Sequence, residues 1–236
     1  MQTLHVITNQ QYLDRQRLPG KVVVVLDVLL ATTTIAMALH HGAREVITVP
    51  EVKDAYPFQN SETLLAGEKD AAIPPGFETF APARLSQHIK PDTRLVLVST
   101  NGTVALHNAN KASHLYTGAL VNATAMSRHI LKHHTEETIL LVCAASRHRF
   151  NIEDFIGAGV LVDQLARRAP ERFNLTDAAV ASRSLATTVD ITTMMHESRV
   201  GRLLHSMDLA EDIALSATLD CYHVVPKDID GRISAV

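Results

Sequence analysis

Three acidic residues are the side chains of this sequence most able to do chemistry. Asp27 directly follows an apolar run, Glu68 follows a short apolar stretch and a glycine, and Asp154 lies near the start of a later segment with helical spacing. An isolated carboxylate beside a buried strand is costly to desolvate, so each acid needs solvent, a cation or a helix N-terminus. If Asp27 and one of the other two met, they would form an oxygen-rich site suited to Mg²⁺, which typically takes one or two carboxylates together with substrate phosphate and water.

Simpler interpretations exist for two of these acids. Asn151 followed three residues later by Asp154 resembles a capping box, so Asp154 could serve only to cap a helix. Glu68 stands beside Lys69 and fits a solvated loop position equally well. Both interpretations stay open at the level of the sequence.

Two further segments carry the small and polar residues that bind phosphate. Both lie where a predicted strand passes into a helix, so that free backbone N–H groups at the helix start face the space above the strand ends. An ordinary helix cap would explain the same residues, so each segment has two interpretations. The candidate phosphate contacts are Thr100, Asn101 and Gly102 in one segment and Thr32, Thr33 and Thr34 in the other.

A cysteine and an arginine have the spacing of a known nucleophile motif. Cys143 and Arg149 match Cys-x5-Arg, the pattern of phosphatases in which a loop binds phosphate around a thiolate. Cys143 is therefore a candidate nucleophile, and its alternative role is that of a small core residue at a strand end. Arg147, His148 and Arg149 form a local basic group beside this strand end, where they could attract an anionic substrate.

Several sharper motifs are absent. The sequence has no Gly-x4-Gly-Lys-Ser/Thr loop, and Gly157-Ala-Gly159 lacks the third glycine of a dinucleotide-binding fingerprint. Phosphatases with an aspartyl nucleophile carry a second Asp two residues after the first, a position that Leu29 fills here. Asp27 is thus expected to act as a ligand or a base rather than as a nucleophile.

The elements that position these residues alternate between strands and helices. Apolar runs predict strands at 22–26, 45–49, 94–98, 113–117 and 138–143, and apolar residues at helical spacing predict helices at 31–41, 103–110, 122–134 and 152–168. Region 50–91 is predicted as loops around a short strand at 63–66, and the chain after Pro170 as mainly helical until a late strand at 222–225. This alternation favours an α/β fold, in which polar residues that follow parallel strands share one crevice.

Composition places the chain among ordinary globular proteins. Of its 236 residues 46% are hydrophobic and 20% are charged, and the formal net charge is -3, which excludes the basic footprint of a nucleic-acid-binding protein. Two cysteines are too few for a disulfide framework, and neither a signal-peptide pattern nor an apolar run of roughly 18 residues is present. We expect a cytoplasmic protein with no membrane partner, built as one domain or as two intimate subdomains with a helix-rich C-terminal part from about residue 170.

Taken in order along the chain, these segments resemble the 2-phosphosulfolactate phosphatase family. The ordered set covers nearly the whole chain and is more specific than any of its members. It consists of 27–34, 65–68, 76–78, 99–103, 122–125, 142–144, Glu153-Asp154 with Ala158-Gly159, 211–213 and 224–226.

The resemblance implies a fold, an activity and roles for particular residues. The fold would be a three-layer α/β/α sandwich around a largely parallel or mixed sheet, usually in a homodimer. The activity would be magnesium-dependent hydrolysis of a small anionic phosphomonoester, 2-phosphosulfolactate or a related phosphorylated acid, which is linked to coenzyme M biosynthesis in some organisms. By position, Asp27, Glu68 and Asp154 become candidate metal or acid/base groups, and Thr100, Asn101 and Gly102 become candidate phosphate contacts. With the residues singled out above, the candidate catalytic residues are Asp27, Glu68 and Cys143, the candidate metal ligands are Asp27, Glu68 and Asp154, and Asn122 and Arg147 are added as candidate substrate contacts.

The sequence also departs from the family pattern. Leu30 stands where the first motif usually has an arginine, so a cation able to bind phosphate or sulfonate is missing, and no apolar side chain replaces a guanidinium. Phe80-Ala-Pro82 replaces an expected Gly-Asn-Ser-Pro turn, and Ala145 replaces a glycine. A catalytically silent homologue that binds anions or senses a metabolite is therefore the alternative function.

Overall fold

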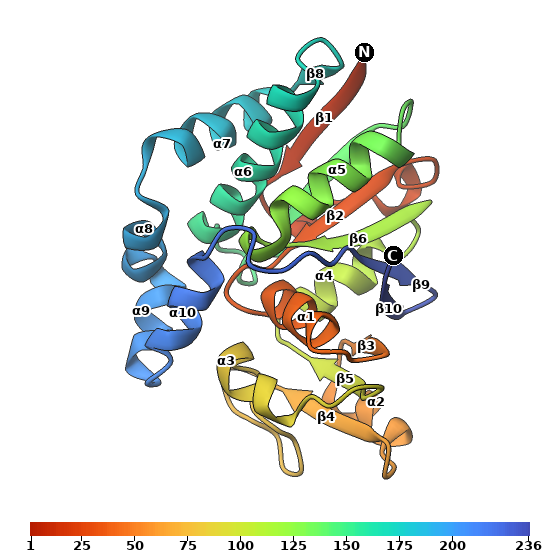
Figure 1. Ribbon diagram of the computed structural model, residues 1–236, viewed down its shortest axis with the longest axis vertical. Coiled ribbons are helices and arrows are strands. Elements are labelled where there is room, and N and C mark those ends of the chain that lie inside the picture. Colours follow the sequence, from red (N-terminus) through yellow and green to blue (C-terminus); the bar gives the residue numbers. More distant parts are fainter.

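The computed structural model describes residues 1–236 as ten strands and ten helices joined by loops and short 3₁₀ turns (Figure 1). The strands are β1 (Gln2–Ile7), β2 (Val22–Leu26), β3 (Glu45–Val49), β4 (Thr63–Gly67), β5 (Arg94–Val98), β6 (His114–Gly118), β7 (Ile139–Cys143), β8 (Phe173–Leu175), β9 (Pro226–Ile229) and β10 (Arg232–Ala235). The helices are α1 (Ala31–His40), α2 (Val52–Ala55), α3 (Pro82–Leu85), α4 (Gly102–Ala109), α5 (Ala123–His133), α6 (Ile152–Arg168), α7 (Asp177–Thr188), α8 (Ile191–Glu197), α9 (Arg199–Ser206) and α10 (Ala210–Ala217).

All the strands belong to one mixed sheet with the order β4-β5-β3-β10-β9-β6-β2-β7-β1-β8. The first three strands are parallel to one another, and so are the last five. The β9–β10 hairpin joins the two groups through antiparallel pairs with β3 and β6. Neighbouring strands twist by roughly 20–25° each, so the five steps from β5 to β2 turn the strand direction by on the order of 100°. The strands of one group run opposite to those of the other, but this twist brings the carboxyl ends of the two groups together.

Alternate side chains along the strands of the sheet belong to two separate apolar cores, one on each face. Val22, Val24 and Leu26 of β2 point into a core shared with α5 and α6. Val23 and Val25 point into a second core shared with α1 and α4. Because a central strand is buried on both faces, β2 reads as an unbroken apolar run. The result is the predicted three-layer α/β/α sandwich, with helices on both faces of the sheet.

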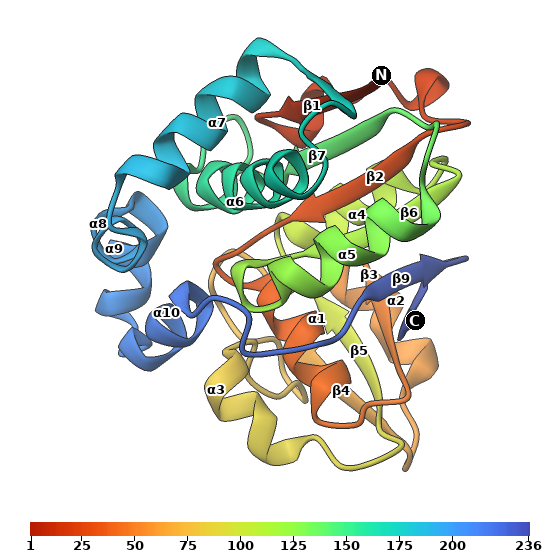
Figure 2. The same ribbon diagram turned by 45° about the horizontal axis from the view of Figure 1, so that its top comes forward.

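Helices α8, α9 and α10 lie together at one side of the molecule, near α3 (Figure 1). Figure 2 shows the same group beside the ends of α1 and α6. Ser198 begins α9 by accepting a hydrogen bond at 2.8 Å from Gly201 N–H, which places Arg199 at the first turn of that helix. None of the helices has the length and apolar character needed to cross a membrane.

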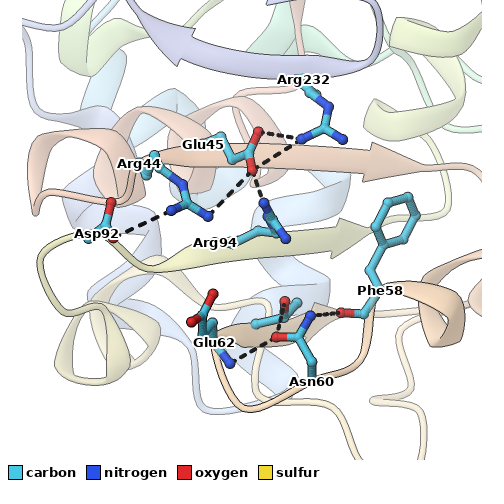
Figure 3. Close-up of polar contacts among 9 residues, drawn as sticks. Arg44, Glu45, Phe58, Asn60, Glu62, Asp92, Arg94 and Arg232 are labelled. Carbon is cyan, nitrogen blue, oxygen red and sulfur yellow. Dashed lines mark hydrogen bonds and ion pairs between the residues drawn. The ribbon is translucent and has the colours of Figure 1, made fainter.

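A charged network ties the hairpin to the smaller group of strands (Figure 3). Glu45 on β3 accepts from Arg94 on β5 at 2.6 Å and from Arg232 on β10 at 3.0 Å. Burial alone would raise the pKa of Glu45, but the two guanidinium groups lower it below its ordinary value. The ion pairs therefore link three neighbouring strands across the junction between the two parallel groups.

The structure confirms most of the predicted elements and corrects one. Strands 22–26, 45–49 and 94–98 lie where the sequence predicted them, and the other central elements shift by one residue or two at their ends. The late strand predicted at 222–225 is wrong, because that segment is irregular and the strand begins at Pro226. Tyr222 N–H donates to Val121 O at 2.8 Å in a loop, so its hydrogen bonds lie outside the sheet. Strands β1, β8, β9 and β10 were not predicted, and region 50–91, predicted as loops around one strand, also contains the short helices α2 and α3.

Candidate active site

A cleft of about 660 Å³ lies where the loops after four strands meet α9. The loops follow β2, β4, β5 and β7 and supply most of the polar lining, while α9 and the start of α1 supply much of an apolar wall. The polar lining includes Asp27, Glu68, Thr100, Arg147, Arg149 and Arg199, and the apolar wall includes Leu29, Leu30, Phe80, Val200, Leu203 and Met207. The convergence of strand-end loops predicted from the sequence is therefore present.

Asp27 lines this cleft with only 6% of its surface exposed. Burial, together with the charges of Glu68 and Glu153, raises its pKa to about 7, and hydrogen bonds from Ala31 N–H and Gly102 N–H oppose the rise. The two N–H groups belong to the first turns of α1 and α4, so two helix N-termini face one carboxylate. A Cβ atom at Gly102 would lie 2.5 Å from Asp27 Oδ2, so only glycine permits this approach.

Glu68 is oriented by the loop that follows β5. Its Oε1 accepts from Thr100 N–H at 2.6 Å, and its Oε2 accepts from the Thr100 hydroxyl at 2.8 Å and from Ala71 N–H at 2.7 Å. Asp70 N–H in turn donates to the Thr100 hydroxyl oxygen at 2.7 Å. Of the two interpretations left open for Glu68, the structure favours a fixed carboxylate at the cleft wall over a freely solvated loop position.

Glu153 is an acid of this region that sequence reasoning left without a role. It is 1% exposed, and its Oε1 is a buried oxygen without a hydrogen-bond partner. Burial raises its pKa, while the charge of Arg199 opposes the rise, and the negative charge of Glu153 contributes to the raised pKa values of Asp27 and Asp154. A buried carboxylate oxygen without a donor, close to other acids, fits a cation. Asp27 and Glu68 line the cleft and Glu153 lies behind its lining, so the three carboxylates are oxygen donors of the kind that Mg²⁺ prefers, but their oxygens do not all lie within 4.8 Å of one another.

Asp154 holds two loops together and does not cap its own helix. Its Oδ1 accepts from Val28 N–H at 2.9 Å, and its Oδ2 accepts from Ala145 N–H at 3.1 Å. Asn151 makes no side-chain cap on α6, so the capping-box interpretation is wrong. Asp154 is fully buried and lies behind the cleft lining, where it fixes the loops after β2 and β7.

The three consecutive threonines use their hydroxyl groups locally. Thr32 donates to Asp27 O at 2.9 Å, Thr33 donates to Val28 O at 2.9 Å, and Thr34 donates to Phe80 O at 3.0 Å. Only Thr34 borders the cleft. These bonds tie the start of α1 to the end of β2, and they explain the three residues without a substrate contact.

The segment after β5 that was predicted to bind phosphate is bonded to side chains of the protein itself. Thr100 N–H is bonded to Glu68 and Gly102 N–H faces Asp27, so both are already paired with carboxylates. Asn101 borders the cleft and accepts from Arg147 N–H at 3.1 Å through Oδ1. Ser99 and Thr103 close the loop by bonding each other. The free charge for an anion must therefore come from elsewhere.

Basic side chains at the cleft supply that charge. Arg147 forms an ion pair with Asp70 between the loops after β7 and β4. Arg149 is exposed at the end of a tight turn that begins at Ser146. Arg199 donates to Asn151 Oδ1 at 2.7 Å. Arg149 forms no ion pair with a carboxylate, so its guanidinium group can bind an anionic ligand. Arg199 also lies close enough to Glu153 for its charge to lower the pKa of that acid.

Two predicted site residues lie away from the cleft. Cys143 is the last residue of β7, is fully buried in an apolar core, and has a pKa raised well above its ordinary value by burial and by the neighbouring acids. Asn122 is also fully buried, with Ala119 N–H donating to its Oδ1 at 2.9 Å and its Nδ2 donating to Val224 O at 3.1 Å. Neither side chain borders the cleft.

Comparison with known proteins identifies the family. The family model described as 2-phosphosulpholactate phosphatase matches residues 7–230. This chain belongs to the 2-phosphosulfolactate phosphatase family. Proteins named probable 2-phosphosulfolactate phosphatase are similar to it in Carboxydothermus hydrogenoformans (36% identity over 209 residues, 88% of this chain and 86% of the relative) and Thermotoga petrophila (32% over 212 residues, 88% and 89%). A relative with the same name in Clostridium novyi is 28% identical over 229 residues, with 95% and 96% covered.

Family membership confirms the resemblance inferred from the ordered motifs. The structure shows where the residues that depart from the family pattern lie. Leu30 is buried in the apolar wall of the cleft, so the position of the usual arginine does border the ligand space. Ala145 has φ of 59°, in the left-handed region where glycine is the natural residue. Phe80 lines the same wall as Leu30. The use of magnesium, the homodimer and the cytoplasmic location stay predictions.

Proposed function

We propose that this protein hydrolyses the phosphate monoester of a small, multiply anionic acid, with 2-phosphosulfolactate as the first candidate, and that Mg²⁺ is its cofactor. The observation that carries the proposal is that Asp27 and Glu68 line one cleft with Glu153 buried near them, where the charges of Glu68 and Glu153 raise the pKa of Asp27 and one oxygen of Glu153 lacks a partner. Such a cluster is unfavourable without a cation. The family and its named relatives support the phosphatase class.

In this proposal Asp27 and Glu68 hold the cation, and Glu153 completes the negative donor set. A bound Mg²⁺ supplies charge neutralisation for the phosphate in its ground and transition states. Thr100 keeps both Glu68 oxygens in place, which removes the cost of orienting that carboxylate when substrate arrives. Asp154 does the same for the loops that carry Val28 and Ala145.

The substrate would bind between the acids and the basic side chains. Arg149 and Arg199 line the cleft, and their guanidinium groups are suited to the carboxylate or sulfonate of the substrate. Asp27 lines the cleft directly, so its carboxylate can orient the attacking water. The buried, protonated thiol of Cys143 is outside this scheme.

A phosphate-release screen tests the proposal. Small phosphorylated acids, including 2-phosphosulfolactate, are offered to the wild-type protein with and without Mg²⁺, and to Asp27→Asn and Asp212→Asn. Asp212 is a matched control because it is also a buried acid with a raised pKa, on α10 and outside the cleft lining. We expect magnesium-dependent release that falls by about 100-fold or more in Asp27→Asn and is retained in Asp212→Asn.

Two outcomes of the screen would contradict the proposal. Tight binding of phosphorylated acids with no phosphate release from any of them would favour the catalytically silent, anion-binding homologue. Loss of all activity in Cys143→Ser, with the fold intact by circular dichroism, would instead indicate a covalent phosphoenzyme on the thiol. We expect Cys143→Ser to keep the wild-type turnover number.

Two further proposals concern the setting of the enzyme. The two cysteines are free thiols, which suits a reducing compartment such as the cytoplasm. A role in coenzyme M biosynthesis would follow if 2-phosphosulfolactate proved to be the preferred substrate of the screen.

A further inference from the structure

A second group of possible metal ligands lies at the opposite ends of the strands from the cleft. His114 is the first residue of β6, His134 follows the last turn of α5, and Glu137 lies in the turn that leads into β7. One ligand atom from each of the three lies within 4.8 Å of the other two. Since β7 has five residues, this group is separated from the strand-end loops of the cleft by roughly 16 Å of strand.

The distances within this group are close to those of a metal site. Glu137 Oε1 lies 3.4 Å from His134 Nδ1 and 3.8 Å from His114 Nε2. In a tetrahedral zinc site with bonds of about 2.0–2.1 Å, neighbouring donor atoms are about 3.3 Å apart. His114 and Glu137 keep 35% and 29% of their side-chain surface exposed. Both side chains can therefore move by the few tenths of an ångström that separate the distances from Glu137 Oε1 from those of a tetrahedral zinc site.

The backbone around His134 and Glu137 is fixed in advance. Gln2 Nε2 donates to His134 O at 3.0 Å and to Glu137 O at 2.8 Å. Arg172 donates to Gln2 Oε1 at 2.5 Å and also bonds His134 O. The turn between α5 and β7 is therefore held by two side chains from distant parts of the sequence, so a ligand would spend little free energy on ordering it.

His134 also has the hydrogen bond that metal-binding histidines usually make through their second nitrogen. Its Nε2 lies 2.8 Å from the Tyr116 hydroxyl, which in turn lies 3.1 Å from His129 Nε2. If Tyr116 donates to His129, it accepts from His134 Nε2–H, and the lone pair of His134 Nδ1 then faces Glu137. In the other tautomer His134 Nδ1–H donates to Glu137 Oε1 at 3.4 Å, and a metal ion would take the place of that proton. Burial lowers the pKa values of His129 and His134, which keeps both rings in the neutral form.

We propose that His114 Nε2, His134 Nδ1 and Glu137 Oε1 bind a divalent transition metal, with Zn²⁺ as the best match. Two imidazoles and one carboxylate are ligands that zinc accepts, whereas Mg²⁺ prefers oxygen donors alone. The fourth position would face solvent beside the half-exposed His114 and Glu137. Because the ion would cross-link β6, α5 and β7 far from the cleft, its effect would be on stability and it goes beyond the proposed phosphatase activity.

Metal titration of the intact protein tests this site. Co²⁺ and Zn²⁺ are added in the presence of excess Mg²⁺, which occupies the oxygen-rich acids of the cleft. We expect the wild-type protein to give the visible absorption of tetrahedral Co²⁺ and a higher melting temperature with Zn²⁺. His114→Gln and Glu137→Gln should each weaken binding by about 100-fold, since loss of even an outer-shell partner costs 10–100-fold. Both changes are at partly exposed positions, so the variants should fold.

Two histidine variants act as controls. His133→Gln alters an exposed histidine of the same helix that is not a ligand, and it should bind Zn²⁺ like the wild-type protein. The titration is repeated in a His205→Gln background, because His196 and His205 form a separate imidazole pair on α8 and α9 at 2.8 Å. Equal Zn²⁺ affinity in the wild-type protein and in a His114→Gln, Glu137→Gln double variant would overturn the proposal, and so would the absence of tetrahedral Co²⁺ absorption.

Discussion

Glu68 and Thr100 are joined by two hydrogen bonds, one from the Thr100 N–H to Oε1 at 2.6 Å and one from its hydroxyl to Oε2 at 2.8 Å. The pair connects the loop after β4 with the loop after β5, two segments that are 32 residues apart in the sequence. Both oxygens of the carboxylate are thus directed by a single residue. Because Oε2 accepts two hydrogen bonds and Oε1 only one, Oε1 keeps a lone pair with which this fixed carboxylate could hold a cation.

Thr100→Val should weaken magnesium binding because it removes the hydroxyl that directs Glu68 and keeps the shape of the side chain. Loss of an outer-shell partner typically costs 10–100-fold in metal affinity, and we expect about 10-fold here because the backbone bond remains. The measurement is phosphate release as a function of Mg²⁺ concentration.

The control for this variant is Thr100→Ser, which keeps the hydroxyl and should need no more Mg²⁺ than the wild-type protein. A Thr100→Val protein with an unchanged Mg²⁺ requirement would show that Thr100 does not position the metal ligand. A drop in turnover that excess Mg²⁺ fails to restore would indicate that Thr100 contacts the substrate instead.

Asp27→Asn should stabilise the metal-free protein at neutral pH. The folded-state pKa of Asp27, about 7, lies above the ordinary value of 3.8 for an aspartate, so the folded protein binds the proton more tightly than the unfolded chain does. The free energy of unfolding contributed by this group is therefore highest at low pH, falls as the pH rises through this window, and is constant above it. Asparagine carries no charge, so the variant should escape this loss.

Urea denaturation with a chelator, at about pH 5 and about pH 8, measures the effect. Asp27→Asn should exceed the wild-type protein in stability at the higher pH, and the difference should shrink toward the lower pH. Added Mg²⁺ should then stabilise the wild-type protein more than the variant. The interpretation fails if the two metal-free proteins lose stability equally as the pH rises.

The central strands were predictable from the sequence because burial on both faces gives strands such as β2 an unbroken apolar run. Val22–Leu26 is apolar on both faces, as a strand covered by helices on both sides must be. The β9–β10 hairpin was missed because its short strands contain charged residues and gain their stability from pairing with β3 and β6. Tertiary pairing of this kind leaves little local signal.

The site was predictable at Asp27 and Glu68, where an acid follows a strand directly, but less so elsewhere. Glu153 and Asp154 are neighbours on one helix, and only the rotation of α6 decides which carboxylate bonds the loops and which is left without a donor. Threonines 32 and 33 looked like phosphate contacts because the sequence does not reveal which carbonyls their hydroxyls reach. Contacts between distant segments set these roles.

Ala145→Gly should stabilise the protein because Ala145 adopts φ of 59°. The left-handed conformation costs an alanine about 1–2 kcal/mol, and the greater freedom of glycine in the unfolded chain offsets part of the gain. We expect an increase of about 0.5–1 kcal/mol in the free energy of unfolding. Ala144→Gly, at a buried neighbour without a positive φ, is the matched control and should lower stability. If both variants lost stability, strain at Ala145 would be refuted.

Leu30→Arg should change which substrates the enzyme prefers. Leu30 is the residue before α1. It borders the cleft, and most of its side chain is buried in the apolar wall. An arginine there can lay its methylene stem along this wall and present the guanidinium to the ligand. A charge-assisted hydrogen bond to sulfonate or carboxylate is worth about 1.5–3 kcal/mol, so the kcat/KM for 2-phosphosulfolactate should rise by about 10-fold or more. A phosphate monoester without the second anion should gain less.

Leu30→Gln separates the effect of charge from that of polarity and size. We expect this variant to bind doubly anionic substrates no better than the wild-type protein, because an amide makes neither the charge-assisted nor the bidentate contact. Steady-state kinetics on a matched pair of substrates, with and without the sulfonate, provide the measurement. If arginine and glutamine gave the same ratio of kcat/KM values for the two substrates, position 30 would not face the second anion. The preference would then have to be set by Arg149 and Arg199, whose guanidinium groups also line the cleft.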